Sequence, residues 1–170
     1  LGGLFFKSHH YKKAEDMYLK ALEKHKQLSE KTVGTYESDL ASTYINLGCL
    51  FDTTKHYKAS EDMYLKALEI NKGMCEKNVD AYEPILASTY NNMGSLFYNA
   101  KQYKKAEDMY LKALEIRKRL CEKNTEAFES DLAASYATLG SLYCDTNRDS
   151  ESEDFFIKAL RIYEHLFEKN

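Results

Sequence analysis

Tyr11-Lys-Lys-Ala-Glu-Asp-Met-Tyr-Leu-Lys-Ala-Leu-Glu23 recurs without change as residues 103–115. A near copy covers residues 57–69, and a more divergent copy covers residues 149–161. The copies begin at residues 11, 57, 103 and 149, so the period is 46 residues. A fixed period of this length is typical of repeat proteins, in which each unit buries its apolar face only by stacking on its neighbours. The repeat therefore predicts a solenoid.

The composition favours helices. Of the 170 residues, 44% are hydrophobic and 30% are charged, which is a globular balance. Ala, Leu, Lys, Glu and Met are frequent, there is one proline, and no Val/Ile-rich alternating segment of strand length occurs. We predict an all-α fold.

The charge pattern argues against nucleic acid and membrane as partners. The 24 Lys and Arg residues are interleaved with 27 Asp and Glu residues, so no basic stripe faces a phosphate backbone. The longest apolar runs are only a few residues, and residues 1–7 lack the order of a signal peptide. We expect a soluble protein.

The four cysteines do not resemble a disulfide framework. Cys75 and Cys121 lie 46 residues apart, at equivalent places on successive repeats. Helices pack about 8–10 Å apart, beyond the ~7 Å Cα separation that a disulfide spans. We expect free thiols and a reducing, cytoplasmic location.

Each repeat is expected to hold two antiparallel helices, a helix A followed by a helix B. In helix A, Tyr44, Leu47 and Gly48 form part of an amphipathic stripe. A glycine inside a helix costs roughly 1 kcal/mol, so its return at residues 2, 48, 94 and 140 indicates close approach of a partner helix. We expect small Ala106 and Ala113 of helix B to face Gly94, with Tyr110 filling the gap beside them.

The repeat boundaries follow from this register. We assign a partial repeat to residues 1–35 and repeats to residues 36–81, 82–127 and 128–170, forming a single array. The first residues match the middle of a later helix A, so we expect a fragment of a longer protein. Short links join helix A to helix B, and we expect a longer link at residues 78–83, with Pro84 at the first position of the next helix A.

These positions resemble the tetratricopeptide repeat. Its pattern of an aromatic residue, Leu-Gly, an aromatic residue and then Ala, an aromatic residue and Ala is met by Tyr90, Met93, Gly94, Phe97, Ala106, Tyr110 and Ala113. The usual repeat has about 34 residues. The longer period and the pair Asn91-Asn92 resemble the long-repeat type found in kinesin light chains and in bacterial multi-repeat proteins. We expect the extra length at the end of helix B and in the loop after it.

The resemblance implies a right-handed α-solenoid whose inner wall, built by A helices, binds extended peptides or other protein elements, without catalysis. The A-helix positions turned away from helix B are small and polar in this chain. They form the expected peptide-binding groove: Ser42, Ile45, Asn46, Cys49, Ser88, Asn91, Asn92, Ser95, Tyr98, Ala137, Thr138 and Ser141. No Lys or Arg stands there, which disfavours a clamp for a terminal carboxylate.

No nucleophile with a base, phosphate-binding loop or metal-ligand cluster occurs, so we expect no enzyme activity, cofactor or metal. The sequence predicts a protein-interaction scaffold with a protein or peptide ligand. Two alternatives stay open: a structural spacer array that associates weakly end to end with copies of itself, and the regulatory arm of an enzyme or signalling protein whose catalytic domain lies outside this chain.

Overall fold

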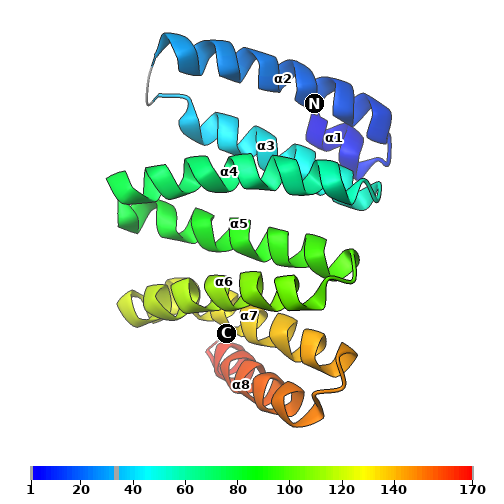
Figure 1. The fold of residues 1–170 in the computed structure, drawn as a ribbon. Helices are drawn as coiled ribbons and strands as arrows, with labels where there is room; N and C mark the ends of the chain where they lie inside the picture. The colour runs from blue at the N-terminus through cyan, green and yellow to red at the C-terminus, as the bar shows by residue number, and fades with distance from the viewer. Residues whose placement is uncertain (1, 33–34, 170) are drawn as a thin grey trace. The chain divides into compact units, whose positions relative to one another are not determined.

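The computed structural model describes residues 2–32 and 35–169, and the regular structure in these ranges is entirely α-helical (Figure 1). This confirms the all-α helical-repeat fold. The helices are α1 (Gly2–Lys7), α2 (Tyr11–Lys31), α3 (Glu37–Thr53), α4 (Tyr57–Lys77), α5 (Val79–Asn99), α6 (Tyr103–Lys123), α7 (Thr125–Asp145) and α8 (Asp149–Glu168). The odd-numbered helices are the predicted A helices, and the even-numbered helices are the B helices.

The chain forms two compact units, residues 1–82 and 83–170. In unit 1, helices α1, α2, α3 and α4 pack in sequence order, each against the next. In unit 2, α7 packs against both α6 and α8. Helices α2 and α6 therefore each pack against the A helix of the following repeat. The right-handed sense of the array stays a prediction.

The turn from helix A to helix B has the same backbone in every repeat. One residue adopts a positive φ, with values of 60°, 61°, 57° and 57° at His9, Lys55, Lys101 and Asn147. The next residue donates its N–H to a carbonyl five residues back, as Gln102 does to Phe97 over 2.7 Å. This is the Schellman pattern, which satisfies the last carbonyls of helix A and reverses the chain.

The link from helix B to the next helix A differs from the prediction. In place of a loop over residues 78–83, one residue separates α4 from α5, and one separates α6 from α7. Asn78 and Asn124 each end one helix and cap the next: their side chains accept from the N–H groups of Ala81 and Ala127, at 3.2 and 3.1 Å. An asparagine side chain is a good helix N-cap, so the extra residues of the long repeat become additional helical turns.

Pro84 is therefore not the first residue of its helix. It is the sixth residue of α5, which begins at Val79 because Asn78 caps it. Proline lacks an N–H, so this position removes one intrahelical hydrogen bond close to the first turn. The signal missed in the sequence is Asn followed two residues later by Asp or Glu, a common helix start.

The recurrent glycines lie under aromatic rings. A Cβ at Gly48 would lie 2.8 Å from Tyr64 Cε1, and one at Gly140 would lie 3.0 Å from Phe156 Cδ1. Tyr18 and Tyr110 cover Gly2 and Gly94 in the same way. The prediction of close approach at these glycines is confirmed, but the group that needs the space is the helix B ring rather than the neighbouring alanines.

In two repeats the small residue one turn before the ring also contacts helix A. Where this residue is serine, its Oγ donates to the glycine carbonyl: Ser60 to Gly48 and Ser152 to Gly140, both at 2.8 Å. Both serines are buried. A buried hydroxyl is accepted at an alanine position because it finds this acceptor.

Gly94→Ala and Gly73→Ala form a matched pair of substitutions with opposite expected effects. At Gly94 a Cβ would overlap the Tyr110 ring, whereas at Gly73, in α4, nothing lies within 4 Å of the added Cβ. We expect Gly94→Ala to lower the free energy of unfolding by about 1–3 kcal/mol through overpacking. Gly73→Ala should raise it by about 0.5–1 kcal/mol through helix propensity. Urea denaturation of both variants measures the two changes, and equal effects would contradict the ring-on-glycine packing.

Candidate peptide-binding surface

All the residues predicted for the groove lie on A helices. In unit 1 they are on α3: Ser42, Ile45, Asn46 and Cys49. In unit 2 they are on α5 and α7: Ser88, Asn91, Asn92, Ser95 and Tyr98, and Ala137, Thr138 and Ser141. Each is exposed or half-buried, as a contact surface requires.

The asparagine amides are the polar groups of this surface that are free to bind. Asn46 is exposed, and Asn91 and Asn92 are half-buried. Within residues 2–32 and 35–169, none of these three side chains makes a hydrogen bond. An amide carries two donor hydrogens and an acceptor oxygen, so each offers a complete peptide-like edge to a ligand.

Most of the serine and threonine hydroxyl groups of this surface are already satisfied within their own helices. Ser88 donates to the Pro84 carbonyl at 3.0 Å, Thr138 to Ala134 at 2.8 Å and Ser141 to Ala137 at 3.1 Å. This i−4 back-bonding occupies the donor hydrogen and leaves only acceptor lone pairs for a ligand. These three positions therefore offer a ligand small side chains to pack against rather than hydrogen-bond donors.

Three of the predicted residues contact the buried side of the helix pairs. Ile45 packs against the buried cluster formed by α2, α3 and α4. The Sγ of Cys49 accepts a hydrogen bond from the Tyr64 hydroxyl at 3.1 Å, and burial raises the pKa of the thiol. One repeat later, Tyr110 reaches Ser95 in the same way, at 3.3 Å. The sequence periodicity did not distinguish these structural roles from exposed ones.

An acidic residue absent from the prediction joins the surface in unit 2. The Tyr98 hydroxyl, on α5, donates a hydrogen bond to the carboxylate of Asp145, the last residue of α7. This bond raises the pKa of Tyr98 to about 12, because ionisation of the phenol would place two negative charges together. No repeat position signals the pair, since residues 98 and 145 are 47 apart instead of 46.

A cavity of about 460 Å³ adjoins the predicted surface in unit 1. Ser42 and Asn46 line it from α3, and Tyr18 and His25 line it from α2. His25 Nδ1 lies 2.9 Å from Thr43 Oγ1, so a hydrogen bond joins the two helices in the lining of this cavity. The unpaired Asn46 amide is thus at the edge of a concave region.

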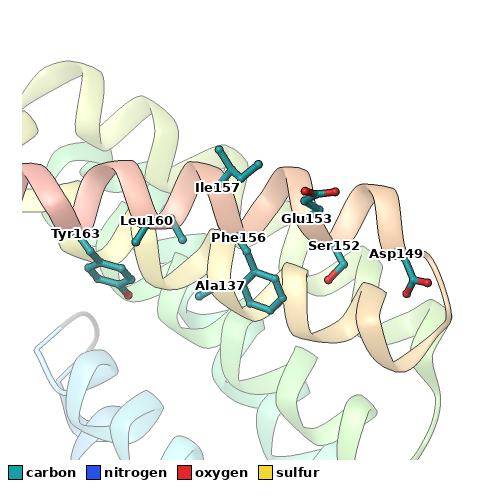
Figure 2. Close-up of a pocket in the computed structure, with 9 residues that line it drawn as sticks. Ala137, Asp149, Ser152, Glu153, Phe156, Ile157, Leu160 and Tyr163 are labelled. Atoms are coloured by element: carbon teal, nitrogen blue, oxygen red, sulfur yellow. The ribbon is translucent and has the colours of Figure 1, made fainter.

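A second cavity, of about 590 Å³, lies along α8 (Figure 2). Figure 2 shows the ring of Phe156 next to Ala137 of α7, with Leu160 and Tyr163 following along α8. Phe156, Leu160 and Tyr163 are 42%, 55% and 42% exposed. On α6 the residues at the same repeat positions, Tyr110, Leu114 and Arg117, are 5%, 4% and 9% exposed because α7 covers them.

Within the described residues, no group of three or more His, Cys, Asp or Glu side chains is arranged to hold a metal ion. In the same part of the chain, no helix combines the length and apolar character needed to cross a membrane. None of the four cysteines, all of which lie in the described part of the chain, forms a disulfide bond.

Comparison with known proteins gives one consistent family. Two sequence models, both of the tetratricopeptide repeat, match residues 85–165 and 41–73. No curated protein matches the sequence.

Solved structures of similar fold span nearly the whole chain. The crystal structure of BtubC (BKLC) from P. vanneervenii aligns with a TM-score of 0.77 and 25% identity, over 97% of this chain and 60% of that one. The apo form of RapI aligns with a TM-score of 0.75 and 21% identity, over 96% and 41%. MamA aligns with a TM-score of 0.58 and 17% identity, over 99% and 97%. The chain therefore spans less than two thirds of the length of BtubC and of RapI.

The Tyr98–Asp145 contact gives a titration that can be measured. In Asp145→Asn the neutral partner no longer opposes ionisation, so the pKa of Tyr98 should fall from about 12 towards its ordinary value near 10. In the unsubstituted chain, the contribution of this bond to folding is present below pH 10 and is lost as the pH rises through 12. NMR titration of ¹³C-labelled tyrosine rings follows Tyr98, and Tyr143, which bonds to Glu107, is the internal control. An unchanged Tyr98 pKa would contradict the contact.

Proposed function

Because the chain belongs to the tetratricopeptide repeat family, whose arrays are protein-interaction scaffolds, we propose that it binds an extended peptide or protein segment along its A helices. The fold is generally non-catalytic, and we propose no enzymatic activity. The 46-residue period and the Asn91-Asn92 pair support assignment to the long-repeat, kinesin-light-chain-like type. The absence of disulfide bonds among the four cysteines is compatible with a reducing, cytoplasmic location.

The unpaired amides of Asn46 and Asn92 carry this proposal. They occupy the same repeat position, on α3 in unit 1 and on α5 in unit 2. An amide can donate to a carbonyl and accept from an N–H, so each can hold one peptide unit of an extended ligand without reading its side chain. Asn91, Ser95 and Tyr98 would then set preference through shape and individual hydrogen bonds.

Selection of displayed peptides against the whole chain, followed by calorimetry, tests this function. Each lost hydrogen bond in a partly desolvated surface costs about 0.5–1.5 kcal/mol, so Asn46→Ala with Asn92→Ala should weaken a selected peptide roughly ten-fold. The melting temperature should hardly change, because neither amide bonds to the protein. Gln27→Ala, which removes an exposed amide from helix α2, is the matched control. Unchanged affinity in the double variant would place the binding surface elsewhere.

The exposed apolar face of α8 favours a second candidate function, end-to-end self-association. The residues of this face occupy the repeat positions that α7 covers on α6. The shape of the face therefore suits a helix packed in the way that α7 packs on α6. We propose that a helix of a second copy occupies it at high protein concentration. The gain comes from removing Phe156, Leu160 and Tyr163 from water.

Sedimentation across a range of concentrations tests the association. Leu160→Glu should leave only monomer, because an unpaired carboxylate would be desolvated in the contact. Leu111→Glu is the control, because Leu111 is also exposed but lies on α6 outside this face. A strict monomer at millimolar protein, or equal effects of the two substitutions, would contradict the proposal.

A further inference from the structure

Unit 1 contains a small cavity of about 250 Å³ between α3 and α4, close to the end of α2. Its lining combines two carboxylates, one ammonium group and two apolar side chains around a glycine: Glu37, Glu69, Lys77, Leu40, Ile70 and Gly73. Pockets for drug-sized molecules measure about 300–1,000 Å³, so this one suits a single side chain.

The corresponding place in unit 2 is filled by an arginine. Arg119 Nη2 lies 2.6 Å from Glu83 Oε1, and Arg119 Nη1 lies 3.3 Å from Glu115 Oε1. Lys123 Nζ is 3.6 Å from the other oxygen of Glu83. One guanidinium group thus bridges two carboxylates, one from helix A and one from helix B.

The two places use the same repeat positions with one exception. Glu37, Glu69 and Lys77 precede Glu83, Glu115 and Lys123 by 46 residues each. Gly73 precedes Arg119 by the same interval. Glu83 and Glu115 hold a guanidinium group in unit 2. Their counterparts in unit 1 line an open cavity, because glycine stands there in place of the arginine.

The charge and the burial of the glutamates also differ between the two places. Glu83 has a side chain that is 6% exposed, whereas that of Glu37 is 25% exposed. Lys77 bonds to both oxygens of Glu37, at 3.0 and 2.8 Å, yet one ammonium against two carboxylates leaves a negative charge at the cavity. In unit 2 Arg119 neutralises this charge. A basic side chain recurs in the last repeat, where His165 Nδ1 lies 3.1 Å from Glu129 Oε2.

We infer that the cavity between Glu37 and Glu69 is a binding site for a guanidinium group, supplied by an arginine side chain of a protein partner. Arginine suits the site because its planar fork can reach two carboxylates at once, which an ammonium group cannot do in the same geometry. Leu40 and Ile70 would pack against its methylene stem. None of these residues belongs to the A-helix surface proposed for peptide binding, so the two sites can be tested separately.

NMR titration of the whole chain with Nα-acetyl-L-arginine amide tests the site directly. We expect a saturable shift of the Gly73 backbone amide. The citrulline analogue has nearly the same shape without the charge and should produce none. Gly73→Arg supplies the guanidinium from the chain itself and should abolish the shift, whereas Gly73→Ala should retain it. Glu69→Gln should weaken binding roughly five-fold.

Unit 2 provides the converse experiment. Arg119→Gly removes the resident guanidinium, so a second saturable site should appear around Glu83 and Glu115. The absence of a saturable Gly73 shift, equal binding of the citrulline analogue, or unchanged binding by Gly73→Arg would each overturn the inference. No second site in a folded Arg119→Gly variant would also count against it.

Displayed peptides identify the source of the arginine. Peptides selected on the unsubstituted chain should include a class that contains arginine, binds less well when that arginine becomes citrulline, and does not bind Gly73→Arg. Binding of the small probe without any such peptide would overturn the assignment to a protein partner. A loss of peptide binding in Asn46→Ala and Asn92→Ala but not in Gly73→Arg would support the A-helix surface and leave this site without a peptide ligand.

Discussion

Each helix pair depends on one contact, an aromatic ring of helix B packed against a glycine of helix A. The ring needs the space of the missing Cβ, and this requirement sets both the separation of the two helices and their register. In return the ring is almost fully buried where the following A helix covers it, as α7 covers Tyr110. The free energy gained by burying the ring offsets the intrinsic cost of glycine within a helix.

The length of the repeat has a structural consequence beyond spacing. Asn78 and Asn124 join one helix directly to the next, so the additional residues of the 46-residue period extend both helices. The added turns at the end of helix B carry Arg119 and Lys123, which reach back to Glu83 at the beginning of helix A. These ion pairs join the end of helix B to the first turns of helix A. They also create a place where one substitution, glycine for arginine, leaves a cavity.

The predicted binding surface is less uniform than its residue types suggest. Serine and threonine hydroxyls on a helix bond to the carbonyl four residues back, so most of them have no free hydrogen for a ligand. Asparagine cannot do this as readily in helical geometry, and Asn46, Asn91 and Asn92 keep their amides free among the described residues. The surface therefore combines a few free amides with small side chains whose hydroxyl groups are mostly bonded to their own helix. This combination suits an extended peptide.

The sequence alone determined the helix pairs and the glycines at which they approach closely, because a strict 46-residue period places the same chemistry at the same point of every repeat. It could not determine contacts between residues that break the period, such as Tyr98 with Asp145, or contacts between distant positions, such as Glu83 with Arg119. Nor did it reveal that Cys49 and Ser95 accept hydrogen bonds from helix B tyrosines. Periodicity reports which face a residue occupies, whereas hydrogen bonds, ion pairs and cavities depend on which side chain arrives from another helix, and only the packed structure decides that.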